Sequence, residues 1–510
     1  MSATGRNVVA NLAGRFWSNL LSIAVVPLYL KFLGIESYGL IGIFATLQGV
    51  VALFDLGLVW VLMRELASLS AREDSAPRQR DLMRTVETMY WAIAAMAAAL
   101  VVVLARPLAS GWLIVEGLPL ETVTSAVRLM ALGVAFQFPF AIYQGALIGM
   151  QRQVAVNVIL SVTGTVRAVG GVLLVWYHPN IVLFLGWQGV ISFLSTSLVA
   201  LYAWRVLPKA PERPAFRFAL VSGSWRYAMG ATLIALATTV LFQADKIVLS
   251  KMLTLTAFGY YTVAQSIASV LWSVARPISS AVFPRFAQLM AMKDDAAVTS
   301  LYHRSQQIMS VLLGPAALLI VFFSYEMVLV WTHDPKTAQN TWLVAALCAV
   351  SVLGLGLGDI PHFTRLASGW VRLSLVLNSV LIAVVIPSLA LAARSYGAVG
   401  SAAVWASVSF VYMIFSVVLM HRRMLRGELP RFLFRDTALP LAAATVVALI
   451  GRELVPHSTS ATVLVLSVGL VYVLMLIAAV AALPDLRGTA LQRMQALFAS
   501  HVRNRSRAER

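Results

Sequence analysis

Charged residues are scarce in this sequence, and acidic residues are the scarcest of them. Only 12% of the 510 residues are charged, with 21 acidic against 39 basic side chains, while 60% are hydrophobic. Soluble proteins of this size carry about 25% charged residues. The composition therefore indicates a polytopic membrane protein, in which basic residues collect in the cytoplasmic loops. The net charge of +18 has this origin, and we expect no nucleic-acid partner.

Residues for metal, redox or nucleotide chemistry are also missing. Cys348 is the only cysteine and lies in an apolar segment, so no intramolecular disulfide can form. The histidines show no metal-ligand spacing, and no glycine-rich loop precedes a Lys-Ser/Thr pair. We therefore expect no cofactor, no metal and no catalytic residue. The first apolar segment contains Arg15 and lacks a convincing cleavage site, so we interpret it as a retained helix.

Long apolar stretches account for most of the chain. About 20 apolar residues suffice to span a bilayer as a helix, and fourteen stretches reach that length with soft ends, of which the thirteenth is the shortest. They run over 11–33, 39–66, 88–112, 123–150, 154–176, 181–207, 225–253, 258–289, 306–331, 341–367, 371–393, 398–420, 437–454 and 461–483. The predicted fold class is an all-α polytopic membrane protein with about 14 transmembrane helices.

The basic residues set the predicted orientation. Thirty of the 39 fall on alternate connecting segments and at the two chain ends, which places both termini in the cytoplasm by the positive-inside rule. The outer connections are short, and no soluble domain is inserted between spans. The nine basic residues elsewhere are Lys31, Arg106, Arg128, Arg167, Lys246, Lys251, Lys336, Arg394 and Arg452.

An internal repeat predicts the architecture. Segments 31–39 and 251–259 both begin with Lys and end in an aromatic residue followed by Gly, at a spacing of 220 residues. Segments 149–152 and 369–372 share the pattern Gly-x-x-Arg at the same spacing. Six predicted helices separate the copies. We therefore expect two pseudo-symmetric six-helix lobes, helices 1–6 and 7–12, around a central cavity, with two extra C-terminal helices.

The corresponding domain boundaries follow the predicted helices. We expect an N-terminal six-helix lobe over 1–210, a cytoplasmic inter-lobe linker over 211–222, a C-terminal six-helix lobe over 223–425, extra helices 13 and 14 over 436–483, and a basic cytoplasmic tail over 484–510.

A family resemblance rests on the first two predicted helices. The pattern comprises an early helix with Arg15, Asn19 and Pro27, the turn Leu33-Gly34-x-x-x-Tyr38-Gly39, and the run Asp55-Leu56-Gly57-Leu58. It resembles the polysaccharide flippases of the multidrug/oligosaccharidyl-lipid/polysaccharide exporter superfamily. Fourteen helices are more reminiscent of the lipid II flippases in that superfamily than of its many twelve-helix members.

The resemblance implies a function and partners. Such a protein moves a polyprenyl-pyrophosphate-linked oligosaccharide from the cytoplasmic to the outer leaflet of the bacterial inner membrane by alternating access, for cell-surface polysaccharide assembly. Its expected partners are that lipid-linked glycan, membrane lipids, and a glycan polymerase or other assembly machinery. A cation-coupled multidrug exporter of the same fold is an alternative. A membrane enzyme of glycan assembly is a weaker one, because such enzymes usually carry a sizeable outer loop.

Charged residues within the predicted spans are the candidate site. Arginine's planar guanidinium suits pyrophosphate oxygens, so Arg15, Arg276, Arg167 and Arg128 are candidate substrate-binding residues of the cavity. The alternatives are interfacial anchors for Arg15 and Arg276, and a buried ion pair for Arg167.

Acidic and aromatic residues of the spans complete the candidate set. Asp359, Asp55 and Asp245 are candidates for ion coupling, against structural roles in helix packing or ion pairs, including one with the adjacent Lys246 for Asp245. Trp17 and Trp272 neighbour candidate cavity arginines and are candidates for sugar stacking.

Overall fold

The computed structural model describes residues 17, 20–55, 57–70, 72, 74–222, 225–370, 372–455 and 460–484. All regular elements in these ranges are helices, and one isolated β-bridge joins Ile114 to Thr254. The predicted all-α fold class is confirmed, and the chain is a multi-pass membrane protein. Arg15 and the basic tail after residue 484 lie outside the described residues.

Ten described helices are long and apolar enough to cross a membrane, or up to eleven if a bent pair is one span. The number of these helices is lower than the number of predicted spans, partly because one long helix covers two of them. The helix α16, Arg372–Arg423, covers two predicted spans and is broken at Gly397, where φ is 59°. The first predicted span begins among residues outside the described ranges.

Glycine and proline interrupt the helices near the N-terminus. Helix α2, Val26–Val51, bends at Gly34, where φ is 80°. The 3-10 helix η1, Ala52–Asp55, follows it, and α3, Leu58–Leu69, begins after Gly57 with φ at 73°. Glycine adopts these left-handed angles without the steric penalty of a side chain. The Leu33-Gly34 turn and the Asp55 run of the sequence therefore mark real breaks in helical geometry.

The chain forms two compact units, 1–263 with 374–401, and 264–373 with 402–510. Their boundaries fall inside α11, Leu255–Ser269, and inside α16. The predicted division into six-helix lobes stays a prediction.

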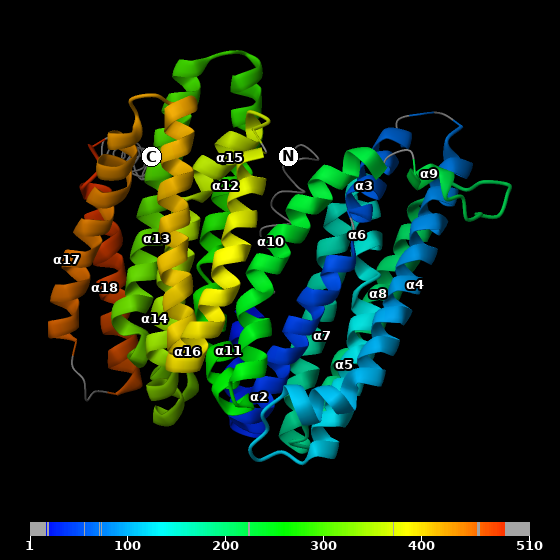
Figure 1. The fold of residues 1–510 in the computed structure, drawn as a ribbon, viewed down its shortest axis with the longest axis horizontal. Helices are drawn as coiled ribbons and strands as arrows, with labels where there is room; N and C mark the ends of the chain where they lie inside the picture. Colours follow the sequence, from blue (N-terminus) through cyan, green and yellow to red (C-terminus); the bar gives the residue numbers. More distant parts are fainter. Residues whose placement is uncertain are drawn as a thin grey trace, which may run out of the picture. The chain divides into compact units, whose positions relative to one another are not determined.

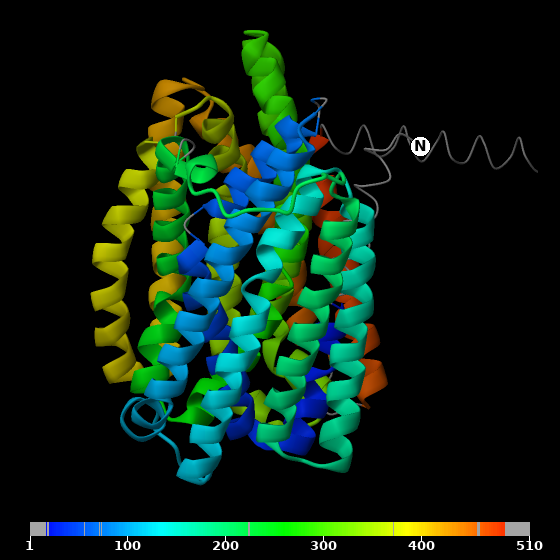
Figure 2. The same ribbon diagram turned by 90° about the vertical axis from the view of Figure 1, so that its right-hand side faces the viewer.

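Long helices that pack side by side make up much of the first unit. Figure 2 shows α4, α5, α7 and α8 running alongside one another, and these helices pack in the pairs α4 with α5, α5 with α8, and α7 with α8. The remaining elements of this unit include the short α9. The bounds are α4 Ala76–Pro107, η2 Leu108–Trp112, α5 Leu120–Gln137, α6 Phe140–Gly149, α7 Gln153–Tyr177, α8 Ile181–Val206, α9 Ala219–Ser222 and α10 Trp225–Met252.

The two copies of the repeated turn meet within the first unit. A Cβ atom added to Gly39 would overlap the backbone oxygen of Leu255, and one added to Gly259 would overlap the backbone oxygen of Ile35. The contact is reciprocal, as expected for two copies related by a pseudo-two-fold axis. Glycine at both positions allows the two backbones to touch.

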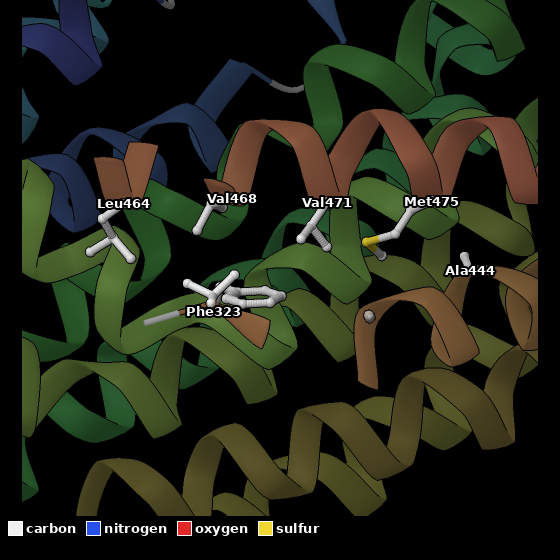
Figure 3. Packing of buried hydrophobic residues seen from close by; sticks show 8 residues of the cluster. Phe323, Ala444, Leu464, Val468, Val471 and Met475 are labelled. Carbon is white, nitrogen blue, oxygen red and sulfur yellow. The ribbon is translucent and has the colours of Figure 1, made fainter. Parts of the chain in front are cut away.

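The second unit contains the extra C-terminal helices. Figure 1 shows α17 and α18 beside α13, and both helices pack against it. Figure 3 shows Val468, Val471 and Met475 of α18 directed towards Phe323 of α13, which is fully buried. The bounds are α12 Trp272–Ala291, α13 Asp295–Thr332, α14 Pro335–Leu357, α15 Asp359–Ala367, η3 Arg431–Ala438, α17 Leu439–Leu454 and α18 Ala461–Ala481.

Candidate functional site

A cavity of about 250 Å³ lies in the first unit between two helix breaks. One break is the end of α2 with η1, and the other separates α5 from α6 at Pro139. Proline cannot donate a backbone hydrogen bond, which favours a break at that point. Three polar side chains reach an otherwise apolar wall. The lining residues are Gln48, Val51, Ala52, Asp55, Val134, Gln137, Phe138 and Ala141.

Asp55 stands at the first break and is held by neutral donors. Its carboxylate accepts a hydrogen bond from the Tyr90 hydroxyl and one from the Val59 backbone N–H at 3.4 Å. Tyr90 is fully buried and stacks on Phe138 at 4.8 Å between ring centroids. The tyrosine thus connects the acid of the first helix break to the aromatic residue of the second.

Arg167 lies behind the polar wall of the same cavity. Its Nη2 donates to Gln137 Oε1 at 3.2 Å and to Ser192 Oγ at 3.3 Å. The Ser192 hydroxyl in turn donates to Gln137 Oε1 at 3.2 Å. The predicted alternative of a buried ion pair is not what these contacts show, because both acceptors are neutral. Within these described contacts, no acid balances the positive charge of the guanidinium, which lies one residue behind the cavity wall.

Two other candidates of the first unit are distributed around α7 and α5. The Trp17 indole N–H donates to Thr165 Oγ1 of α7 at 2.9 Å, and its side chain is half-exposed. Arg128 is exposed on α5 and does not line the cavity.

Asp245 of α10 is buried and has two neighbours. Its carboxylate accepts a hydrogen bond from the Tyr261 hydroxyl, while Lys246 Nζ lies 3.8 Å from Oδ1. That lysine also donates to the Phe242 carbonyl at 3.1 Å. The structural pairing with Lys246 is therefore present, but the shorter contact comes from the tyrosine.

Three predicted residues come together in the second unit. Arg276 lies over the Trp272 ring, 5.2 Å from its centroid, and is near enough to Asp359 for an electrostatic interaction. The Ser279 hydroxyl donates to Asp359 Oδ2 at 3.2 Å. This places a cation, an aromatic ring and an acid on α12 and at the start of α15.

Arg365 was not predicted as a site residue, because its position in the sequence indicates an inner-loop charge. Arg365 of α15 is fully buried, and its Nη1 donates to Ser416 Oγ at 2.5 Å. Its Nη2 lies 3.4 Å from His362 Nδ1. Asp359, His362 and Arg365 follow at intervals of three residues, which places them along one helix face. That spacing could have identified the cluster from the sequence.

A second residue that the sequence did not single out is the acid Glu87 of α4. Its side chain is buried and accepts hydrogen bonds from the Tyr143 hydroxyl at 2.6 Å and from the Trp204 indole at 3.0 Å. Arg84 completes the group with a 2.8 Å ion pair. Because these three neighbours all donate to its carboxylate, Glu87 links α4 to α6 and α8.

One network among the described residues suits the recognition of an anion. No group of three or more His, Cys, Asp or Glu side chains in the described part of the chain could hold a metal ion. Phosphate oxygens are recognised by guanidinium groups together with neutral donors. The Arg167, Gln137 and Ser192 network supplies that set of groups.

The chain matches a protein-family model and is similar in fold to solved structures. The model of the polysaccharide biosynthesis protein family matches residues 4–290. The fold is similar to the lipid II flippase MurJ in an inward closed conformation, with TM-score 0.69 and 12% identity over 91% of this chain and 97% of that one.

Two multidrug transporters are also similar in fold. An inward-facing MATE family transporter of the MOP superfamily gives TM-score 0.60 and 14% identity over 81% of this chain and 96% of that one. The MATE multidrug transporter DinF-BH in complex with R6G gives TM-score 0.61 and 15% identity over 82% of this chain and 95% of that one. No curated protein sequence matches this chain at a significant level.

Proposed function

The chain belongs to the polysaccharide biosynthesis protein family, and we propose that it moves a polyprenyl-pyrophosphate-linked oligosaccharide across the bacterial inner membrane. Membership of this family and the MurJ-like fold place it among transporters rather than enzymes. The direction is from the cytoplasmic to the outer leaflet, with both termini in the cytoplasm. The transported lipid supplies material for cell-surface polysaccharide assembly, together with a glycan polymerase or other assembly machinery.

The cationic network at the cavity of the first unit carries this proposal. Arg167 is held by Gln137 and Ser192, and neither of these neutral side chains balances its charge. An arginine in a membrane-spanning helix is costly, by about 2.5–3.5 kcal/mol on insertion scales, and such residues mark transport pathways. A pyrophosphate carries the complementary charge. A cationic drug does not, which favours the glycan lipid over the multidrug substrate.

Arg276 is the second proposed cation, acting from the second unit. It lies over Trp272 and near Asp359, so its charge is partly balanced there. We assign it to the headgroup together with Trp272, whose ring also suits stacking on a sugar. Trp17, whose indole N–H donates to Thr165 of α7, is the corresponding aromatic residue of the first unit. Arg15 and Arg128 stay in the proposal as predicted from the sequence.

Alternating access needs contacts between helices that can open and close during transport. The reciprocal packing of Gly39 on Leu255 and of Gly259 on Ile35 supports such a contact, because the two glycines let the backbones of the two copies meet directly. By the positive-inside prediction this contact lies on the outer side. We propose that it opens when the headgroup leaves towards the outer leaflet.

Ion coupling would use the three intramembrane aspartates. Asp55, Asp245 and Asp359 each accept a hydrogen bond from a hydroxyl group, those of Tyr90, Tyr261 and Ser279 respectively. Hydroxyl donors leave a carboxylate able to exchange a proton or a cation, whereas a close bidentate arginine would hold it charged. We propose that one or more of these acids link transport to an ion gradient.

Transport in liposomes tests the proposal. Purified protein is reconstituted with an undecaprenyl-pyrophosphate oligosaccharide, and the fraction of headgroups that reaches the opposite leaflet is measured under proton and sodium gradients. Arg167→Ala and Arg276→Ala are expected to lower the rate about tenfold or more, which corresponds to about 1.4 kcal/mol.

Arg106→Ala is the matched control, since Arg106 is an exposed arginine in the last turn of α4 and contacts neither network. Transport that is equal in all four proteins would discard the proposed site. No transport of the glycan lipid under either gradient, together with extrusion of a cationic dye, would replace the flippase with the multidrug exporter.

A further inference from the structure

The segment that connects α16 to α17 separates its charges by sign. Together with the last two residues of α16, it contains two acids, Glu428 and Asp436, and five arginines, and all five arginines are exposed. Asp436 is completely buried, and the Glu428 side chain is 33% exposed. We call residues 422–435 the arginine segment. Its arginines are Arg422, Arg423, Arg426, Arg431 and Arg435.

His303 of α13 accounts for the orientation of both acids. Its Nδ1 lies 2.5 Å from Asp436 Oδ2, and its Nε2 lies 2.9 Å from Glu428 Oε2. Gln307, one turn further along α13, donates to Asp436 Oδ1 at 2.8 Å. A carboxylate therefore lies opposite each nitrogen of the His303 ring. Both negative charges of the segment are therefore directed towards α13.

Aromatic packing fixes the same orientation. Phe432 of η3 is fully buried and stacks on Tyr302 at 5.7 Å, with His421 at 5.5 Å from the same ring. Phe434, two residues later, is 71% exposed. The inner face of η3 thus carries Phe432 and Asp436, and the opposite face carries arginines with an exposed aromatic ring.

The exposed face continues into a surface that faces lipid. Helix α17 begins directly after η3 and belongs to a candidate membrane span. Val446, Leu449 and Ile450 of α17 are each more than half exposed. Because an apolar face of a spanning helix lies in the hydrocarbon, we place Arg435 and Arg431, one and two turns before the start of α17, at the depth of the phospholipid headgroups.

We propose that the arginine segment is a binding surface for anionic phospholipid headgroups. Its ligand chemistry is the phosphodiester anion of phosphatidylglycerol or cardiolipin, with Phe434 inserted at the boundary of the acyl chains. Arginine suits phosphate oxygens, and basic residues next to a span attract anionic lipids. His303 is a positioning residue that keeps the two acids out of this surface. The proposal is independent of the transported substrate, since bilayer phospholipid occupies the surface whether or not a glycan lipid is present.

Labelled lipids test the proposal on the full chain. A fluorophore is attached to a Leu439→Cys variant, in which the native Cys348 is buried and stays in place. The protein is reconstituted in phosphatidylcholine nanodiscs that contain a small fraction of nitroxide-labelled phosphatidylglycerol or nitroxide-labelled phosphatidylcholine. We expect stronger quenching by the phosphatidylglycerol at equal mole fraction, and loss of this preference at high salt.

Substitutions locate the preference. The double variant Arg431→Gln/Arg435→Gln is expected to weaken the apparent association of phosphatidylglycerol about tenfold or more, because each basic residue contributes roughly fivefold. The double variant Arg106→Gln/Arg394→Gln, at two exposed arginines elsewhere, is expected to keep the wild-type value. His303→Gln should lower the preference with all five arginines present.

The contrary outcomes are equally clear. Equal quenching by both labelled lipids, or a preference that survives the Arg431→Gln/Arg435→Gln change, would overturn the proposal. Displacement of the labelled lipid by millimolar inorganic phosphate would identify a site for free phosphate and would overturn the assignment to a lipid. All measurements are made without a glycan lipid, so a failure here leaves the proposed transport function untouched.

Discussion

Arg167 and Arg365 show how differently two arginines can be held in one membrane protein. Arg167 in the first unit is half-buried beside a cavity of about 250 Å³, and it contacts Gln137 and Ser192. Arg365 in the second unit is fully buried, and it contacts Ser416 and His362. Neither forms an ion pair in these contacts. The difference is access, because Arg167 contacts Gln137, which lines the cavity, whereas Arg365 is enclosed by protein.

This difference separates a binding role from a structural one. A buried polar group that loses its partners costs the full desolvation free energy, so enclosed groups determine stability. Removing a charged side chain near a cavity costs less folding free energy. It also removes a group that an anionic ligand would contact. We therefore expect the two arginines to respond in opposite ways when stability and transport are measured together.

The largest expected effect on stability is at Arg365. Arg365→Ala removes a buried side chain and leaves Ser416 and His362 without their partner, which should destabilise the protein by about 3 kcal/mol or more. Arg365→Lys should recover only part of this, because lysine lacks the planar fork. Thermal unfolding in detergent measures the change. A melting temperature unchanged in Arg365→Ala would show that the residue is not a structural element of the second unit.

Arg167→Ala should show the reverse pattern. We expect its free energy of unfolding to change by less than about 1 kcal/mol, since both acceptors are neutral. Transport of the pyrophosphate lipid should nevertheless fall about tenfold, or about 1.4 kcal/mol. The two quantities are compared on the same preparation. A proportional loss of stability and transport would erase the distinction drawn between the two arginines.

The two acids beside these clusters give a smaller effect. Asp55→Asn and Asp359→Asn keep the shape of the side chain and its capacity to accept from Tyr90 and Ser279, but they remove the charge. If either acid couples transport to ions, its variant should lose about fivefold of the gradient-driven rate, roughly 1 kcal/mol, and keep exchange without a gradient. A full response to both gradients in both variants would remove these acids from the coupling mechanism.

Asp334 supplies a reference for a charge with a purely local role. It caps α14, and hydrogen bonds from the Thr337 hydroxyl and from backbone N–H groups hold the pKa of its carboxyl below the ordinary value. Asp334→Ala should cost about 0.5–1 kcal/mol of stability without affecting transport.

The pH dependence of this cap has a defined sign. Because the pKa is lower in the folded state, the contribution is present above the unfolded pKa of about 4 and is lost as the pH falls below it. The difference in melting temperature between wild type and Asp334→Ala should therefore shrink towards acidic pH. A constant difference across this range would contradict the assignment.

The fold could be predicted because hydropathy and repeated segments can be recognised directly along the sequence. The 220-residue spacing identified segments 31–39 and 251–259 as copies, and the structure places Gly39 against Leu255 and Gly259 against Ile35. Asp55 and Gly57 were recognised as an unusual point in a span, and the helix does break there.

The sites were harder to predict, because their partners are distant in sequence. His303 meets Glu428 and Asp436 over separations of 125 and 133 residues, which no periodicity reveals. Arg365 follows an apolar stretch and reads as an inner-loop charge, although the fold encloses it completely. For Arg128, a position inside a predicted span does not tell which face of α5 it occupies, and the structure shows that the residue is exposed.

One measurement tests the central claim most directly. Proteoliposomes are loaded with the undecaprenyl-pyrophosphate oligosaccharide or with a cationic dye, and the movement of each is followed for the wild type and for Arg167→Ala. The account predicts that the wild type moves the pyrophosphate lipid, that Arg167→Ala moves it about tenfold more slowly, and that neither protein extrudes the dye. Extrusion of the dye by both proteins, with the pyrophosphate lipid stationary, would contradict it.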